Sequence, residues 1–396
     1  LEQHRRFFRF LRLNRHRFFD EAFQTQLEGM YADAPRGTPP VPAAQLAIAS
    51  LLQAYGKVSD QDAILKMATD RCWQMVLACD DEGLPFKKTT LVDFRSRLVK
   101  AGLHQALLQR TVTLAKETRD FGYNHTAGLQ IALDSAPLEG AGKVEDTINL
   151  LGHALRILMQ AVAAMLVLTP AEVVARAQLP VLAAPSIKAG LDQEWGDAEA
   201  ANRALRGLVE QVERLSAWVA TQQPAEISTR AVQKAHTQLQ HVLNQNTERD
   251  AQLQLQLKEG VSPERQISLG DPEMRHGRKS ETERIDGYKR YLATDLPNDL
   301  VLAACVLPAN VPEAQGADKM RPMLAEHGVV HELWIDCAFT SSALAQEVEK
   351  SPQGRVICRA VRLRNKGAYT KDQFEVDLQA KTVRCPRGQL AVIQNE

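Results

Sequence analysis

The chain has 396 residues, which is enough for two or three domains with cores of their own. Its 44% hydrophobic and 24% charged residues are ordinary for a globular protein. The formal net charge of zero excludes a uniformly basic coat, so any surface that binds nucleic acid must come from local patches.

Neither a membrane protein nor a disulfide-rich secreted protein is indicated. The longest apolar stretch, residues 157–168, is interrupted by Gln160 and is shorter than the roughly twenty residues of a membrane span. The six cysteines form no Cys-x-x-Cys pair. The sequence begins at Leu1 with an arginine-rich run, without the apolar core of a secretory signal. We therefore expect a soluble protein of the reducing cytoplasm, with no membrane partner, whose start is not the native one.

Arginine and phenylalanine alternate in the opening segment, residues 5–19. Two interpretations are open. The arginines could grip phosphates while the aromatic rings stack on bases. Alternatively, the segment is an amphipathic helix that buries Phe7, Leu11 and Phe18 and leaves the arginines in solvent. Residues 42–119 have a helical pattern throughout, which predicts a helical N-terminal domain, residues 1–120, of a kind often used to bind DNA.

After Gly122 the pattern changes to a short buried strand. Four of the five residues 129–133 are apolar, Asp134 follows them, and the Ser-Ala-Pro of residues 135–137 is expected to stop the strand. A helical region then extends to residue 256, and residues 169–172 give one of its helices a capping box and a first-turn proline.

Apolar residues recur at threes and fours over residues 205–219 and again over 232–242, which predicts two helices folded back as a hairpin. This hairpin is either a self-packing scaffold or a coil that binds a partner.

Strands return after the helical region. Residues 285–293 and 300–307, joined by a turn at 296–299, predict an antiparallel hairpin. Asp286 lies within it, and its Asp-Gly setting predicts a turn or bulge. The other expected elements are a helix over 317–326, a strand over 331–336 that ends in Asp336, a helix over 341–350, and strands over 355–360 and 373–378.

Asp134 and Asp336 each end an expected strand. Without the helical region, the element order is that of the ribonuclease-H-like fold, whose first and fourth strands lie side by side and bring their carboxylates together. Either aspartate alone could merely stop its strand and cap the next helix. As a pair they predict a magnesium site, because Mg²⁺ prefers oxygen ligands and two such ions can bind both the attacking and the leaving oxygen at a phosphodiester.

Several blocks of the sequence resemble the DDE transposases of bacterial insertion sequences. Residues 133–137, 140–142 and 146–151 look like the first catalytic block of that family. Similar blocks follow in the family's order at residues 271–280, 286–289, 308–311 and 335–339, and the N-terminal segments 51–55, 58–60 and 90–95 are similar to the family's N-terminal domain.

The resemblance implies an α/β protein in which an all-α N-terminal domain precedes a ribonuclease-H-like catalytic core, residues 121–396, with a helical insertion at 151–260. It implies that Asp134 and Asp336 are catalytic metal ligands and that the intact fold uses two Mg²⁺ ions. The implied partner is DNA, both the transposon ends and the target, and the reaction is strand cleavage followed by strand transfer. Bringing two DNA ends together implies a homo-oligomer.

The third acidic ligand of the family has no match in this sequence. Glu347 and Glu349 follow Asp336 too closely, and Glu396 is the last residue. We expect the third acid beyond Glu396 and the chain as given to be truncated and inactive, because losing one ligand of three weakens metal binding. The alternative is an inactive remnant that only binds DNA. An all-helical scaffold is disfavoured by the strand pattern from Ile285 onward.

Two groups of basic residues are the candidate DNA contacts. Arg275, Arg278 and Lys279 precede a core strand that carries Lys289, and the acids of the same segment make internal salt bridges the alternative. Residues 355–387 contain more basic than acidic residues, and this tract is either a phosphate-binding surface or a solvated face. Its candidate contacts are Arg359, Arg362 and Arg364.

Overall fold

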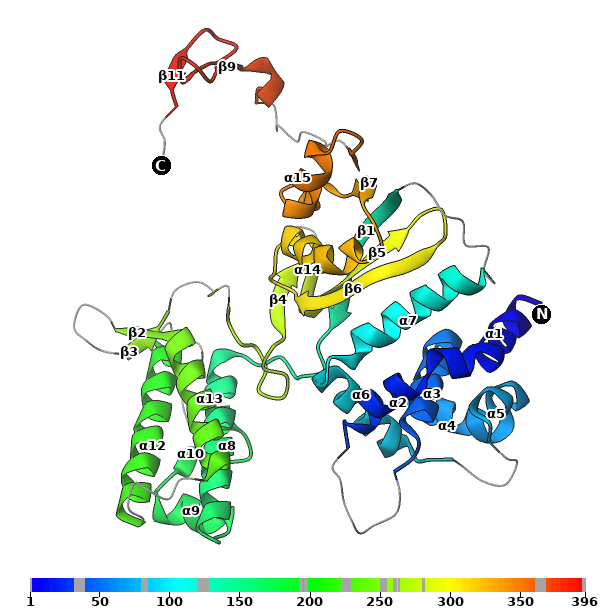
Figure 1. The fold of residues 1–396 in the computed structure, drawn as a ribbon. Helices are drawn as coiled ribbons and strands as arrows, with labels where there is room; N and C mark the ends of the chain where they lie inside the picture. Colours follow the sequence, from blue (N-terminus) through cyan, green and yellow to red (C-terminus); the bar gives the residue numbers. More distant parts are fainter. Residues whose placement is uncertain are drawn as a thin grey trace.

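The structure is a computed structural model. It describes residues 2–31, 40–79, 85–119, 128–191, 195, 199–222, 229–249, 255–258, 262, 264–279, 282–359 and 368–393. Figure 1 shows a helical N-terminal part, a sheet flanked by helices, a separate helical domain and a small C-terminal sheet that stands apart from the rest.

Only helices precede the first strand in the described residues. They are α1 (Glu2–Phe18), α2 (Glu21–Glu28), α3 (Ala43–Gly56), α4 (Asp60–Thr69), α5 (Arg71–Leu77), α6 (Lys88–Lys100) and α7 (Leu103–Thr118). Side chains fix their boundaries where Ser59 caps α4 and Asp70 caps α5. The helical pattern expected for residues 42–119 is thus confirmed over the described part of that range.

Helix α1 is an amphipathic helix, as in the second interpretation of the arginine- and phenylalanine-rich segment. Leu11 and Phe18 are buried in the N-terminal core, and the ring of Phe7 stacks on Tyr55 with 4.0 Å between ring centroids. The arginines at positions 9, 12 and 15 are exposed. The structure thus favours the second of the two interpretations over base stacking, because the aromatic rings pack in the N-terminal core. The basic outer face of the helix remains available.

A mixed sheet forms the centre of the chain. Its main strands are β1 (Leu129–Glu139), β5 (Arg284–Asp295), β6 (Leu300–Pro308), β7 (Val330–Ile335) and β8 (Arg355–Cys358), and β4 (Arg275–Arg278) pairs with the start of β5. The five main strands lie side by side in the order β6-β5-β1-β7-β8. The β1/β5 and β5/β6 pairs are antiparallel, and the β1/β7 and β7/β8 pairs are parallel. The expected hairpin of β5 and β6 is confirmed.

Helices α14 (Glu313–Ala325) and α15 (Ala343–Lys350) cover one face of this sheet, and their apolar side chains share a core with Tyr291, Leu333 and Ile335. Helix α14 begins four residues before the expected start, at Glu313. A short turn of 3₁₀ helix, η1 (Cys337–Phe339), joins β7 to α15.

Two local expectations about the strands are wrong. Strand β1 does not stop at Asp134 but continues through Pro137 to Glu139, because residues 131–139 pair with β5. Pairing with β7 ends at Ala132, and a proline is tolerated where a strand has lost one neighbour. Asp286 forms neither a turn nor a bulge. It lies inside β5 opposite His276, whose Nδ1 is 2.5 Å from the Asp286 carboxylate.

The helical domain between β1 and β4 has a core of its own. It contains α8 (Thr147–Met165), α9 (Pro170–Arg176), α10 (Pro180–Ala183), α11 (Ile187–Gly190), α12 (Ala200–Gln222) and α13 (Arg230–Asn246), with a small hairpin of β2 (Thr247–Arg249) and β3 (Leu255–Leu257). The capping box of Thr169 and Glu172 is confirmed. The two helices expected as a hairpin are α12 and α13, but both pack on α8, so the domain is a bundle around α8.

Helix α8 is long and apolar enough to cross a membrane, judged by length and composition alone. In this structure 56% of the relevant window is buried, and Leu150, Leu155 and Val162 lie in the core of the helical domain. We therefore interpret α8 as the central helix of that domain.

The small C-terminal sheet consists of β9 (Glu375–Asp377), β10 (Thr382–Arg384) and β11 (Leu390–Val392), preceded by the 3₁₀ helix η2 (Lys371–Gln373). Strand β9 corresponds to the strand expected over residues 373–378. Strand β8 ends at Cys358, two residues before the expected end. The candidate DNA contacts Arg362 and Arg364 lie outside the described residues.

Candidate functional site

Asp134 and Asp336 lie at the same level of two neighbouring parallel strands. The register pairs Ala132 of β1 with Trp334 of β7, and each aspartate comes two residues later. Neighbouring strands are about 4.8 Å apart, and residues at i and i+2 point to the same face of a sheet. The two carboxylates therefore share one face at the carboxyl end of β7.

Both aspartates are exposed and line one pocket of about 570 Å³. The pocket is formed by Leu133, Asp134, Trp334, Ile335, Asp336, Ile357, Cys358 and Arg359. Asp336 stands at the N-cap position of η1, but its side chain makes no capping hydrogen bond. Asp134 Oδ1 accepts a hydrogen bond of 2.8 Å from the backbone N–H of Ser135. The carboxylate of Asp336 is thus not used to cap the following helix.

This pair of carboxylates fits a magnesium ion. Mg²⁺ in proteins is often held by one or two carboxylates, with phosphate oxygens of the substrate and water completing the octahedron. Within the described residues, no group of three or more acidic, histidine or cysteine side chains is placed to hold a metal. Glu347 of α15 instead lies 3.4 Å from Arg321 of α14. The described part of the chain supplies two carboxylates.

Two cysteines border the same pocket. The Sγ atoms of Cys337 and Cys358 are 3.2 Å apart, and Cys337 Sγ donates a 2.8 Å hydrogen bond to the carbonyl of Arg359. The Cys358 thiol donates to Cys337 Sγ, and this hydrogen bond, together with burial and the nearby charge of Asp336, raises the pKa of Cys358. The signal for this pair in the sequence was weak, because the two residues stand 21 positions apart.

A second, basic pocket lies at the same end of the sheet but on the other face. Its volume is about 760 Å³, and its lining includes His276, Arg278, Lys279, Arg284, Lys289, Asn310 and Glu313. Lys289 is buried on the same side of β5 as Tyr291, whereas Asp134 pairs with Leu292 and faces the opposite way. Ala338, two residues after Asp336, also lines the basic pocket. The segment after β7 thus separates the two pockets.

The proposed basic contacts are in different environments. Arg278 and Lys279 are exposed and line the basic pocket together, as does Lys289. Only 9% of the Lys289 side chain is exposed, and its Nζ lies 2.9 Å from Glu313 Oε1, which neutralises its charge. Arg359 lies instead at the aspartate pocket.

Arg275 does not reach the basic pocket. Only 15% of its side chain is exposed, and its Nη1 donates to the carbonyls of Pro272 and Met274 at 2.6 and 2.9 Å. Its Nε also lies 3.7 Å from Glu264 Oε2, an acid outside the segment whose internal salt bridges were the alternative.

Arg284 is a basic residue that the sequence did not single out. It pairs with Arg278 across β4 and β5, and its guanidinium contacts Asp286 at 3.2 Å and His276 Nε2 at 2.7 Å. Arg284 lines the pocket because of the register of β4 against β5, and this register could not be predicted from the sequence.

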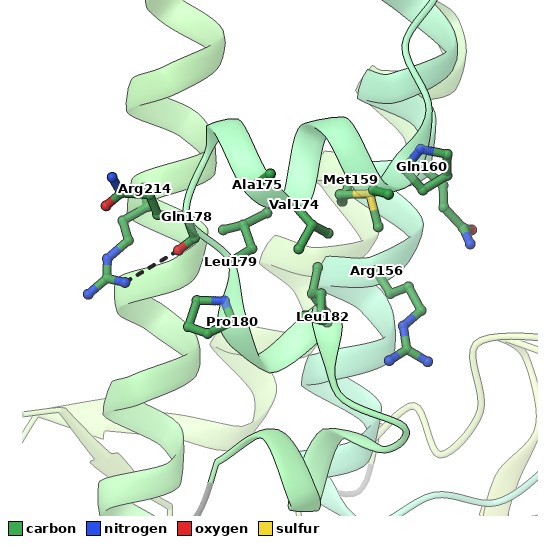
Figure 2. Close-up of a pocket in the computed structure, with 13 residues that line it drawn as sticks. Arg156, Met159, Gln160, Val174, Ala175, Gln178, Leu179, Pro180, Leu182 and Arg214 are labelled. Carbon is green, nitrogen blue, oxygen red and sulfur yellow. Dashed lines mark hydrogen bonds between the residues drawn. The ribbon is translucent and has the colours of Figure 1, made fainter.

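Another hollow, of about 890 Å³, lies in the helical domain (Figure 2). Its lining is mostly apolar, from residues of α8, α9 and α10 such as Met159, Val174 and Leu182, with Arg156 and Arg214 at its sides. Arg214 Nη1 donates to the carbonyl of Gln178 at 3.4 Å. None of the residues that line this hollow is acidic, so it offers no carboxylate ligand for a metal ion.

A comparison with family models found a match in the N-terminal part of the chain. Residues 4–97 match a transposase domain (DUF772). The match covers helices α1 to α5 and most of α6, and therefore the part of the chain with the arginine-rich outer face. It supports a transposase with a function in DNA transposition and DNA as the partner. No curated protein and no solved structure matches the chain.

Proposed function

We propose that this chain is a DDE-type transposase, which cleaves DNA strands and transfers them during transposition. The sheet would be its ribonuclease-H-like catalytic core, and Asp134 and Asp336 would be carboxylates of the metal site. The N-terminal match to a transposase domain gives the substrate class, DNA. The proposal rests most on one observation: two exposed aspartates at the same level of adjacent parallel strands.

The strand arrangement supports the assignment of the core. The order β6-β5-β1-β7-β8, antiparallel among the first three and parallel among the last three, is the arrangement expected of a ribonuclease-H-like fold. The helical domain would then be an insertion after β1. An insertion with its own core can be added to a loop without disturbing the sheet.

The acidic and basic residues of the site would have different roles in the proposed reaction. Asp134 and Asp336 would hold Mg²⁺, which supplies charge neutralisation at the phosphate and activation of the attacking oxygen. The protein's own task in such a reaction is to position the strand and stabilise charge. Arg359 borders the aspartate pocket, and Arg278 and Lys279 lie around the end of the sheet, where they would bind flanking phosphates.

Nicking of a supercoiled plasmid tests the activity. The chain is incubated with plasmid and Mg²⁺ or Mn²⁺, and the open-circular form is measured on a gel. We expect the chain as given to be inactive, because its described residues supply two of the family's three acids. In a version that also carries the third acid, we expect metal-dependent nicking that is lost in Asp134→Asn and in Asp336→Asn and kept in Glu349→Gln, an exposed acid on α15. Nicking that survives in both aspartate variants would show that these carboxylates are not catalytic.

A DNA-binding chain without catalysis is the second candidate. It is favoured by the absence of a third acid from the described part of the pocket. This candidate predicts salt-dependent binding of plasmid or oligonucleotide DNA in EDTA, weakened when Arg278 and Lys279 are both changed to Gln, but no nicking with either metal. Binding without nicking would therefore favour it over the transposase with full activity.

A further inference from the structure

Trp334 is an exposed tryptophan near the end of a core strand. Its neighbours Leu333 and Ile335 are buried under α14 and α15, whereas 44% of Trp334 is exposed. Side chains alternate along a strand, so the indole lies on the opposite face of the sheet. A large aromatic side chain that remains in solvent on a core strand calls for an explanation, because burying it would stabilise the fold.

The indole shares its face and its pocket with both aspartates. Trp334 lines the same pocket as Asp134 and Asp336 and stands two residues before the latter, which is about 6.6 Å along the strand. Its partner on β1 is Ala132, whose small side chain leaves space beside the ring. Stacked nucleotides are about 3.4 Å apart, so a strand with a phosphate at the carboxylates would bring a base one or two positions away to the indole.

Basic residues continue this surface on the next strand. Ile357 of β8 pairs with Trp334, and Arg355 and Arg359 lie two residues to either side of it, on the same face. The side chain of Arg355 is 69% exposed and lies 3.2 Å from Glu332. An exposed aromatic ring beside cationic side chains is the combination that proteins use to bind single strands of nucleic acid.

We propose that Trp334 is a stacking platform for an unpaired base of the DNA strand whose phosphate lies at Asp134 and Asp336. The inference rests on the proposed function, since it takes DNA as the substrate. Trp334 is a positioning residue in this account: it holds the strand end in register with the carboxylates and takes no part in proton or phosphoryl transfer. The π-face of a ring accepts any base, so the contact gives a preference for unpaired strands without a sequence preference.

Binding of a fluorescent oligonucleotide in EDTA tests the proposal without any need for cleavage. Affinity is measured by anisotropy for a duplex with a single-stranded overhang and for the blunt duplex of the same length. The variants are Trp334→Leu, which is apolar but has no ring, and Trp334→Phe, which keeps a ring. Trp195→Leu is the matched control, because Trp195 is also exposed but lies between α11 and α12 of the helical domain.

We expect Trp334→Leu to bind the overhang duplex about tenfold more weakly, which is about 1.4 kcal/mol, and to bind the blunt duplex as the wild type does. Trp334→Phe should recover most of the affinity, and Trp195→Leu should bind as the wild type does. The overhang should also quench tryptophan fluorescence in the wild type, and this quenching should be smaller in Trp334→Phe.

Three results would overturn the inference. Equal binding of the overhang duplex by the wild type and Trp334→Leu would show that the indole does not stack on a base, while DNA binding itself, and with it the proposed function, would stand. If the wild type binds neither duplex, the proposed function fails and the inference fails with it. Loss of self-association in Trp334→Leu, with unchanged DNA binding, would assign the indole to contact with a second copy of the chain.

Discussion

Asp134 and Asp336 come from strands that are far apart in the sequence but neighbours in the sheet, each two residues beyond the Ala132–Trp334 pair. Two like charges at this spacing repel each other, and among the described residues that line the pocket Arg359 alone carries a positive charge. This repulsion destabilises the folded chain when no cation is bound, and it favours binding of a cation between the two carboxylates.

The first prediction concerns stability. In EDTA at low ionic strength, Asp134→Asn should raise the free energy of unfolding by about 0.2–1 kcal/mol, because it removes repulsion between like charges on adjacent strands. An asparagine can still accept the hydrogen bond from Ser135. Urea denaturation measures the change, and Glu349→Gln is the control for loss of an exposed charge. A lower stability of both Asp134→Asn and Asp336→Asn would contradict the prediction.

The second prediction concerns the buried ion pair in the basic pocket. Lys289 and Glu313 have side chains that are 9% and 18% exposed, with Nζ 2.9 Å from Oε1. Lys289→Met or Glu313→Gln alone should cost about 3–5 kcal/mol, because each leaves an uncompensated charge. The double variant should be more stable than either single variant. Additive losses in urea denaturation would mean that the two side chains are not coupled.

The third prediction concerns pH. Burial, together with the charge of Lys116 3.3 Å away, lowers the pKa of His327 below its usual value of 6.5. Glu326 and Asp295 oppose this shift. The folded state therefore resists protonation more than the unfolded chain does. Stability should be full above about pH 6.5 and should fall as the pH is lowered through the pKa of the folded state.

His327→Gln should remove this part of the pH dependence, and Lys116→Met should reduce it. Thermal unfolding of the three proteins over this pH range measures the effect. An unchanged slope in His327→Gln would mean that other groups cause the loss of stability in acid.

The fourth prediction concerns oxidation. The thiols of Cys337 and Cys358 are 3.2 Å apart, close enough to form a disulfide of about 2.05 Å with a small movement. Treatment with hydrogen peroxide should therefore remove two of the six thiols, with the peroxide reduced to water. Cys305 should remain reduced, because burial raises its pKa to about 11. Cys337→Ser should abolish the paired loss, and an equal loss of thiols in that variant would argue against this disulfide.

The sequence predicted the elements of the sheet better than their ends. Short segments rich in apolar residues, each followed by an aspartate, were enough to find β1 and β7. The extension of β1 through Pro137 was missed because it depends on pairing with β5, which is a long-range contact. For the same reason the packing of α12 and α13 on α8 was not predicted: the apolar spacing tells which face is buried but not against which helix.

The environment of individual side chains was harder to predict. Arg275 and Arg278 belong to one short strand. Arg275 nevertheless donates a hydrogen bond to the backbone of the preceding loop, whereas Arg278 lines the basic pocket. Trp334 lies in the strand predicted over residues 331–336, but its exposure was not predicted. Its alternation with the buried Leu333 and Ile335 could have indicated an exposed ring, but only if the opposite face of the sheet were known to be uncovered.

Manganese binding tests the central claim most directly. Mn²⁺ prefers the same oxygen ligands as Mg²⁺ and can be titrated by electron paramagnetic resonance against the wild type, Asp134→Asn and Asp336→Asn. We predict that the wild type binds Mn²⁺ and that either substitution weakens binding at least tenfold, as expected when a direct ligand is lost. Equal Mn²⁺ affinity in all three proteins would mean that Asp134 and Asp336 do not form a metal site.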